Sequence, residues 1–329
     1  MLQKPGMGRL GVPPARRGVS ASLPDFPWDT SAEAEALAGS HPDGIVDLSI
    51  GTPVDPVAPV IREALAAASS APGYPATAGT ARLREAAVAA LDRRFGITGL
   101  TKAAVLPVIG SKELIAWLPT LLGLGPADVV VAPELAYPTY DVGARLAGAQ
   151  VLLADSLTQL GPQSVTLVYL NSPSNPTGRV LGAEHLRKVV GWSRDRGVVV
   201  ASDECYLGLG WDAEPLSVLH PSICDGDHTG LLALHSLSKS SSLAGYRAGF
   251  VAGDPALVVE LLAVRRHARN DGADAGAGCH GGRAGRRRSR KAAARAVRAA
   301  AGGPVAGAAL SRFCYRLFGS RTLLVGHPR

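Results

Sequence analysis

The stretch Leu232-Ala-Leu-His-Ser-Leu-Ser-Lys239 is an apolar strand that ends in a polar turn. The turn places the hydroxyls of Ser236 and Ser238 beside Lys239, and Arg247 follows eight residues later. A lysine after a strand is usually a solvated surface residue. Here the hydroxyls and the arginine could bind a phosphate, while positive charge or burial lowers the pKa of the lysine and frees its amine. The stretch therefore predicts a nucleophilic Lys239 at the end of a buried strand.

Strands of this kind alternate with helices between about Asp43 and His267. Most are Val-, Leu- and Ala-rich runs without polar alternation, as expected for strands buried on both faces. The candidate strands are residues 104–109, 128–132, 166–170, 198–202, 230–235 and 247–252, and the candidate helices are 80–95, 112–122, 140–146, 183–196 and 254–267. The alternation predicts a layered α/β fold with a largely parallel sheet, whose ligands bind at the carboxyl ends of the strands.

Two further polar motifs directly follow candidate strands. Asp203 ends the run from Val198, where it is either a turn residue or an acid that pairs with a ring nitrogen, and Tyr206 comes three residues later. Asn175 lies in a loop of two prolines and a glycine, which can hold its amide rigidly. Both motifs fall where a parallel sheet binds its ligand.

Two other motifs stand at helix starts. Gly110, Ser111 and Lys112 precede a helix, where free amides and the helix dipole attract anions, although an ordinary Gly-Ser helix start has the same letters. Tyr137 lies between a strand and a helix, where it either stacks on a flat ring or joins the core. The motifs together predict a site for a flat, phosphorylated ligand.

Composition limits the class of protein. The chain has 329 residues, 47% of them hydrophobic, so it can bury a large core. Its four cysteines have neither paired nor metal-ligand spacing, which favours a reducing compartment and predicts no metal site. Neither a membrane-spanning apolar run nor a secretory signal is recognisable. We therefore expect a cytoplasmic protein.

Charge is distributed unevenly along the chain. Residues 269–329 hold 13 Lys and Arg against 2 acidic residues, whereas residues 1–268 hold 21 basic and 25 acidic residues. Large apolar side chains are almost absent from the basic segment before Leu310, so it can bury little core and we expect it to be disordered. Such a charge run can mark a nucleic-acid-binding tail, but this one lacks interleaved aromatic residues from 269 to 311.

The order of the motifs resembles that of the class I/II aminotransferases of fold type I, which use pyridoxal 5′-phosphate (PLP). The matching motifs are Gly110-Ser-Lys-Glu, Tyr137-Pro-Thr-Tyr, Asn175-Pro-Thr-Gly, Ser202-Asp-Glu-Cys-Tyr, Ser236-Leu-Ser-Lys and Gly245-Tyr-Arg-Ala-Gly. Upstream, the segment around Gly51 is similar to the loop over the substrate, and that around Tyr74 to the segment that reaches the neighbouring subunit. The resemblance covers about residues 22–267 and implies a three-layer α/β/α fold and a homodimer.

The resemblance also implies a role for each matching residue. Lys239 would form the Schiff base with PLP and then act as the base, and Asp203 would pair with the pyridine nitrogen. Asn175 and Tyr206 would bond the ring oxygen, and Tyr137 would stack on the ring. The implied phosphate ligands are Gly110, Ser111, Lys112, Ser236, Arg247 and, across the dimer, Tyr74. The implied substrate contacts are Gly51 and Asn175.

The motifs Phe26-Pro-Trp-Asp29 and His41-Pro-Asp-Gly-Ile-Val-Asp-Leu-Ser49 are most similar to actinobacterial N-succinyldiaminopimelate aminotransferases of lysine and diaminopimelate biosynthesis. They imply that glutamate gives its amino group to N-succinyl-2-amino-6-oxopimelate, forming N-succinyl-LL-2,6-diaminopimelate and 2-oxoglutarate. The expected partners are therefore small molecules, and we expect binding neither to nucleic acid nor to a membrane. The alternatives are another fold type I enzyme such as a lyase or acyltransferase, a non-enzymatic PLP- or nucleic-acid-binding protein, and an inactive product.

The resemblance also suggests a domain division. We expect residues 1–21 to be a disordered tail, residues 22–45 the N-terminal segment of a small domain, and residues 46–268 the large PLP-binding domain. Residues 269–329 do not match the family, whose members build most of the small domain there and supply the arginine for the substrate's α-carboxylate. Reading the codons of Asn270-Asp-Gly one base later permits Met-Met-Val, as relatives carry. We therefore expect a frameshift near residues 268–270 and an incomplete small domain.

Overall fold

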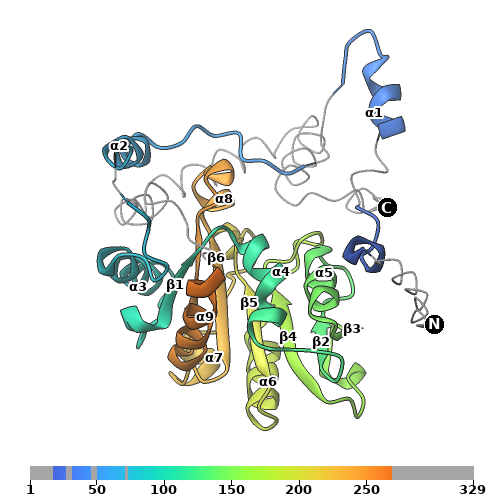
Figure 1. Cartoon of the computed structure of the whole chain (residues 1–329), viewed down its shortest axis with the longest axis vertical. Coiled ribbons are helices and arrows are strands. Elements are labelled where there is room, and N and C mark those ends of the chain that lie inside the picture. The colour runs from blue at the N-terminus through green and yellow to red at the C-terminus, as the bar shows by residue number, and fades with distance from the viewer. Residues whose placement is uncertain (1–17, 27–31, 46–49, 71–72, 269–329) are drawn as a thin grey trace, which may run out of the picture.

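A seven-stranded sheet forms the centre of the computed structural model, which describes residues 18–26, 32–45, 50–70 and 73–268 (Figure 1). The strand order is β1-β7-β6-β5-β4-β2-β3. The strands are β1 (Val105–Val108), β2 (Val129–Ala132), β3 (Gln150–Leu153), β4 (Val165–Asn171), β5 (Val199–Asp203), β6 (Leu231–Ser236) and β7 (Gly249–Gly253). Strand β7 is antiparallel to both of its neighbours and the other pairs are parallel, which confirms the expected mostly parallel α/β sheet.

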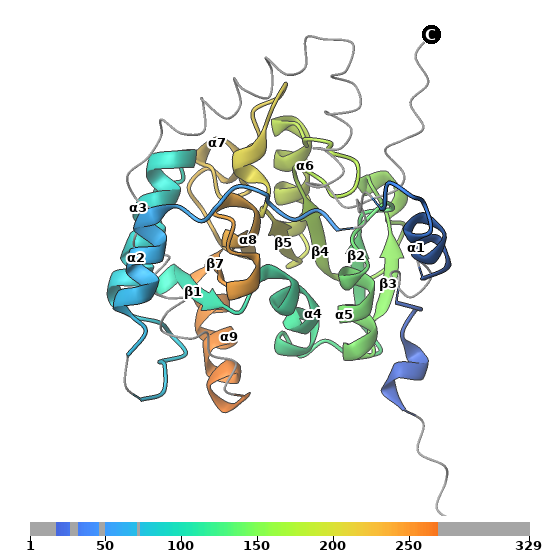
Figure 2. The same cartoon turned by 90° about the horizontal axis from the view of Figure 1, so that it is seen from above.

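The described residues form nine α-helices, some of which cover the two faces of the sheet. They are α1 (Ala32–Gly39), α2 (Pro59–Ala67), α3 (Ala81–Phe95), α4 (Ser111–Leu121), α5 (Thr139–Ala147), α6 (Ala183–Arg194), α7 (Pro221–Cys224), α8 (Leu237–Ser240) and α9 (Pro255–Ala268). Seen from above, α6 and α7 lie on one side of the sheet and α4, α5 and α9 on the other (Figure 2). The expected three-layer α/β/α arrangement is therefore present.

Each face of the sheet has its own apolar core, because successive strand residues point to opposite faces. Val129 and Val131 pack in the core on the side of α3 and α6, whereas Val130 packs in the core beneath α4 and α5. The same alternation holds in β6, where Leu231 and Leu232 belong to different cores. Both faces are buried, which explains the continuous apolar runs in the sequence.

Five elements besides the short 3-10 helices escaped prediction, including the four-residue helices α7 and α8. Strand β3 lies at the edge of the sheet and is only partly buried, and helix α1 has no buried residue, so neither carries a strong apolar pattern. Helix α2 buries Ile61 alone among its residues. Of the tail expected over residues 1–21, residues 18–21 are described and contribute to the exposed 3-10 helix Val19–Ser22. Residues 1–17 and 269–329 lie outside the described part.

The register places the candidate motifs at one end of the strands, where the parallel strands have their carboxyl ends, and we call this end the carboxyl edge of the sheet. Asn171, the last residue of β4, pairs with Asp203, the last residue of β5. Gly249, the first residue of β7, pairs with both Ser236 and Val108, because β7 runs antiparallel to its neighbours. The turns that follow β1, β4, β5 and β6 and the turn that precedes β7 therefore converge at the end of the sheet that carries α8 (Figure 1).

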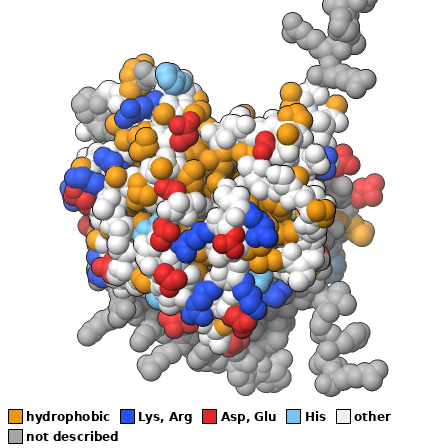
Figure 3. Space-filling view, turned by 90° about the horizontal axis from the view of Figure 1, so that it is seen from below, with side chains coloured by type: hydrophobic (Ala, Val, Ile, Leu, Met, Phe, Trp, Pro, Cys, Tyr) orange, Lys and Arg blue, Asp and Glu red, His pale blue; other side chains and the backbone are white. Residues whose placement is uncertain are grey.

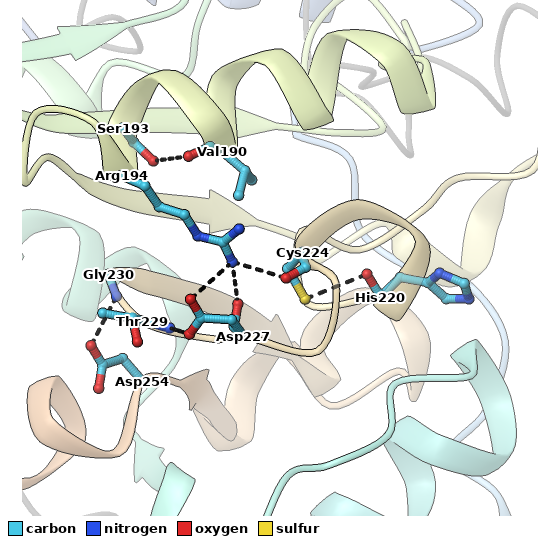
Figure 4. Close-up of polar contacts among 9 residues, drawn as sticks. All are labelled: Val190, Ser193, Arg194, His220, Cys224, Asp227, Thr229, Gly230 and Asp254. Atoms are coloured by element: carbon cyan, nitrogen blue, oxygen red, sulfur yellow. Dashed lines mark hydrogen bonds and ion pairs between the residues drawn. The ribbon is translucent and has the colours of Figure 1, made fainter.

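The opposite ends of the strands, below the sheet in Figure 1, carry a polar network that joins turns to helices. Viewed from below, this side shows Lys and Arg intermixed with Asp and Glu (Figure 3). Arg194 Nη2 donates hydrogen bonds to the carbonyls of Cys224 (2.9 Å) and Asp227 (2.5 Å), which ties the end of α6 to the turn before β6 (Figure 4). Asp254 accepts from Gly230 N and Ala256 N (both 2.8 Å) and so caps α9. Among the described residues, no helix is long and apolar enough to span a bilayer.

Candidate active site

A buried carboxylate lies at the centre of the carboxyl edge. Asp203 is 7% exposed at the end of β5. Its Oδ2 accepts a hydrogen bond from Tyr140 Oη (3.0 Å) and its Oδ1 accepts one from Cys205 N (3.2 Å). Burial raises the pKa of Asp203, and these hydrogen bonds lower it in part. A cation placed against this carboxylate would replace the solvation that it has lost.

Two residues that sequence reasoning missed hold this acid in place. Tyr140 comes from α5, is fully buried and packs its ring 4.9 Å from that of Tyr169. Asn171 donates from Nδ2 to the carbonyl of Asp203 (3.0 Å) and accepts from Asn175 N at Oδ1 (2.7 Å). Asn171 thus joins the predicted Asn175 loop to the predicted acid. Tyr140 stands inside the matching motif Tyr137-Pro-Thr-Tyr, whereas Asn171 is the last residue of β4, four positions before Asn175.

Lys239 lies half-buried in the short helix α8 that follows β6. Ser236 caps this helix, because its hydroxyl accepts from Ser238 N (3.1 Å). Burial lowers the pKa of Lys239, which increases the fraction of neutral amine. Its Nζ donates to the carbonyl of Gly51, so the upstream segment passes directly over the amine. The structure therefore brings Gly51 next to Lys239.

An anion cradle lies beside the lysine, at the start of α4. Gly110 has φ of 100°, and a Cβ at this position would lie 2.9 Å from Cζ of Arg247, so the arginine packs on the bare glycine backbone. Arg247 itself has φ of 49° and donates to the carbonyl of Ala244 (2.8 Å). Ser111 is the first residue of the eleven-residue helix α4. A guanidinium over the free amides of a helix start is suited to a phosphate.

The predicted aromatic residues take different positions. Tyr137 is half-buried, and Lys112 Nζ lies 5.3 Å from its ring centroid, within the range of a cation–π contact. Tyr206 is 5% exposed, and burial raises the pKa of its hydroxyl. Tyr74 is 85% exposed in the segment that joins α2 to α3.

The residues present fit PLP. Gly110 and Arg247 form a cradle that a Cβ would fill, the buried Asp203 would pair with a protonated ring nitrogen, and Lys239 offers an amine of lowered pKa. The described residues contain no group of three or more His, Cys, Asp or Glu side chains that could hold a metal ion. The site is therefore suited to an organic phosphate with a basic ring.

The chain is similar to known aminotransferases. The family described as aminotransferase class I and II matches residues 43–271. A protein of Mycobacterium tuberculosis named Probable aminotransferase is 82% identical over 80% of this chain, and the chain spans 63% of that relative's length. The 4-dedimethylamino-4-oxo-anhydrotetracycline transaminase of Streptomyces rimosus is 58% identical over 75% of this chain and 68% of its own. The structure of a probable N-succinyldiaminopimelate aminotransferase from Thermus thermophilus is 29% identical with a TM-score of 0.73, covering 83% of this chain and 77% of that one.

Proposed function

The chain belongs to the class I and II aminotransferase family, and on this basis we propose that it transfers an amino group from a small-molecule donor to a keto or aldehyde acceptor. One observation carries the proposal: the amine of Lys239, the buried carboxylate of Asp203 and the cradle of Gly110 and Arg247 meet at the carboxyl edge of the sheet. These are the groups that amino transfer through PLP requires.

In the proposed site, each group has a distinct task. When bound, PLP supplies an electron sink for the carbon that loses its proton. Asp203 holds a proton at the ring nitrogen, and Tyr140 and Asn171 fix the orientation of the carboxylate. Lys239 takes up and returns a proton, because burial keeps more of its amine neutral. Gly110, Ser111, Lys112, Ser236 and Arg247 hold the phosphate.

The remaining roles concern the ring and the substrate. Tyr137 stacks on the ring, whereas Tyr206 and Asn175 bond its oxygen. Gly51 and Asn175 contact the substrate, since Gly51 lies against Lys239 and the Asn175 loop is tied to Asp203 through Asn171. We infer a homodimer in which the exposed Tyr74 reaches the phosphate of the neighbouring subunit.

For the substrate we propose glutamate as donor and N-succinyl-2-amino-6-oxopimelate as acceptor, a reaction of diaminopimelate and lysine biosynthesis. The sequence motifs at Phe26 and His41 and the similarity to the Thermus thermophilus structure support this choice. A polycyclic ketone is the second candidate acceptor, because the Streptomyces rimosus relative, at 58% identity, is named for a tetracycline-type ketone. A cytoplasmic location suits either reaction and the unpaired thiols of Cys205 and Cys224.

The test is an assay of 2-oxoglutarate formed from glutamate by the purified chain with PLP, offered each acceptor class in turn. We expect Lys239→Ala to lose both product formation and the absorbance change on adding PLP. Lys188→Ala is the matched control, because Lys188 pairs with Glu184 on the exposed surface of α6. Production of ammonia or an acyl-transfer product in place of 2-oxoglutarate would favour a lyase or acyltransferase instead.

We also infer that the reading frame changes near residues 268–270, where the composition changes and close to residue 271, the last position of the family match. Residues 269–329 would then lack the arginine that grips the α-carboxylate, and we expect PLP binding to survive better than amino transfer. Sequencing the coding DNA tests this inference. Early stop codons in the shifted frame, or the absence of a family-like segment there, would contradict it.

A further inference from the structure

Arg265 is the most completely buried charged residue among those described, with 0% exposure. It lies in the last turn of α9, where Nη1 donates to both carboxylate oxygens of Glu113 (3.1 and 3.3 Å). Glu113 keeps 16% of its side chain exposed and is the third residue of α4. The pair therefore joins the end of α9 to the first turn of the helix that follows Gly110.

Burying such a pair is costly, since both groups lose their hydration and an apolar pair of the same size is often as stable. A purely cohesive contact between α4 and α9 would not need charges, because the surrounding core is built from apolar residues such as Leu114, Val258 and Leu261. The charges instead fix one geometry, since the guanidinium must meet the carboxylate in a defined orientation.

The pair of Arg265 and Glu113 lies at the first turn of α4, next to Gly110. Helix α9 runs from the end of β7 back toward the start of α4, so Arg265 meets Glu113 three positions after Gly110. Glu113 stands within one turn of the amides of Ser111 and Lys112, where an unneutralised carboxylate would repel a bound phosphate. Arg265 cancels this charge and holds the turn in place.

We propose that Arg265 and Glu113 are positioning residues for the phosphate of the cofactor. Arg265 orients the first turn of α4 and neutralises Glu113, so that the amides at residues 111 and 112 present a net attraction to an anion. The pair acts on the phosphate group alone and not on the aldehyde end of the ligand. The inference rests on the proposed function, because it takes PLP as the ligand.

The experiment compares PLP with pyridoxal, which lacks the phosphate, by absorbance titration of the full chain. We expect Arg265→Met to weaken PLP binding by about tenfold, because it leaves the Glu113 carboxylate unneutralised near the phosphate, and to leave pyridoxal binding nearly unchanged. Adding Glu113→Gln to Arg265→Met should restore part of the PLP affinity by removing the unneutralised carboxylate. Arg194→Met is the matched control, since it removes a guanidinium at the opposite edge of the sheet.

Equal weakening of both ligands, or an unchanged preference for PLP over pyridoxal, would overturn the inference while leaving the proposed function intact. A wild-type chain that captures neither ligand would overturn both. Where Arg265→Met does not fold, Arg265→Lys replaces it, because a lysine keeps the charge but loses the planar donor group. It should reduce the preference for PLP less than tenfold, and no reduction would count against the positioning role.

Discussion

Glu204→Gln removes a buried acid directly beside the candidate active site and should change how the stability of the protein depends on pH. Glu204 is 2% exposed, and its Oε1 accepts from Val218 N (2.9 Å). Its Oε2 lies 3.7 Å from Nε2 of His235 in β6, a distance suited to an ion pair. Burial nevertheless favours the neutral form of both groups, since it raises the pKa of Glu204 to about 7 and lowers that of His235 to about 3.

The two groups affect stability in opposite directions. The usual pKa of glutamate is 4.5, so between pH 4.5 and about 7 folded Glu204 keeps a proton that the unfolded chain has released. This bound proton stabilises the folded state. Its contribution to the free energy of unfolding is complete below pH 4.5 and is lost as the pH rises to about 7, which lowers that free energy by about 3 kcal/mol. The contribution of His235 is complete above its usual value of 6.5 and is lost as the pH falls to about 3. Between pH 4.5 and pH 6.5 the two groups change the free energy of unfolding with pH by equal amounts in opposite directions, so their effects cancel.

Urea unfolding of both proteins at several pH values measures this effect. The free energy of unfolding of Glu204→Gln minus that of wild type should increase by about 3 kcal/mol from pH 4.5 to pH 7, because only the wild type loses the proton of Glu204 over this range. Glu184→Gln is the exposed control. Because Lys188 lowers the pKa of Glu184, its difference should be small and opposite in sign. A stability difference for Glu204→Gln that stays constant over this range would refute the assignment of a neutral buried acid.

Three further substitutions test the site. Gly110→Ala should weaken PLP binding and destabilise the fold by about 1–3 kcal/mol, measured by titration and thermal unfolding, because residue 110 has φ of 100° and faces Arg247. Tyr140→Phe should cost about 1 kcal/mol in urea unfolding and raise the pKa of Asp203 further, since it removes one donor to that carboxylate. Asp203→Asn should reduce amino transfer in steady-state assays by at least about 100-fold, because the ring nitrogen loses its charged partner; an activity within a few-fold of wild type would exclude the proposed role of Asp203.

The strands of the inner sheet were predictable because their burial leaves a direct trace in the sequence. Val129–Ala132 contributes alternate residues to two separate cores, so every position must be apolar. Strand β3 leaves no such trace, since Gln150 and Leu153 are exposed at the edge of the sheet. The charge-rich α1 has no buried residue and likewise gives no apolar pattern.

The candidate site was predictable where its residues lie at the end of a strand or shortly after it, as Asp203 and Lys239 do. The residues that hold them were not predictable, because their partners are remote in the chain. Tyr140 lies 63 residues from Asp203, and Arg265 lies 152 residues from Glu113. Periodicity indicates which face of a helix is buried, but it does not indicate which polar group a buried side chain meets.

The end of β5 shows how one strand serves both the chemistry and the core. Asp203 turns toward Tyr140 on the side of α5, whereas the next residue, Glu204, turns toward Val218 and His235 on the other side. An ionised Glu204 would place a second negative charge next to Asp203 and would raise the pKa of Asp203 further, because like charges disfavour each other's ionisation. Burial keeps Glu204 protonated below about pH 7, so below that pH Glu204 adds no negative charge next to Asp203. The neutral pair of Glu204 and His235 therefore adds no charge that would oppose the role proposed for Asp203.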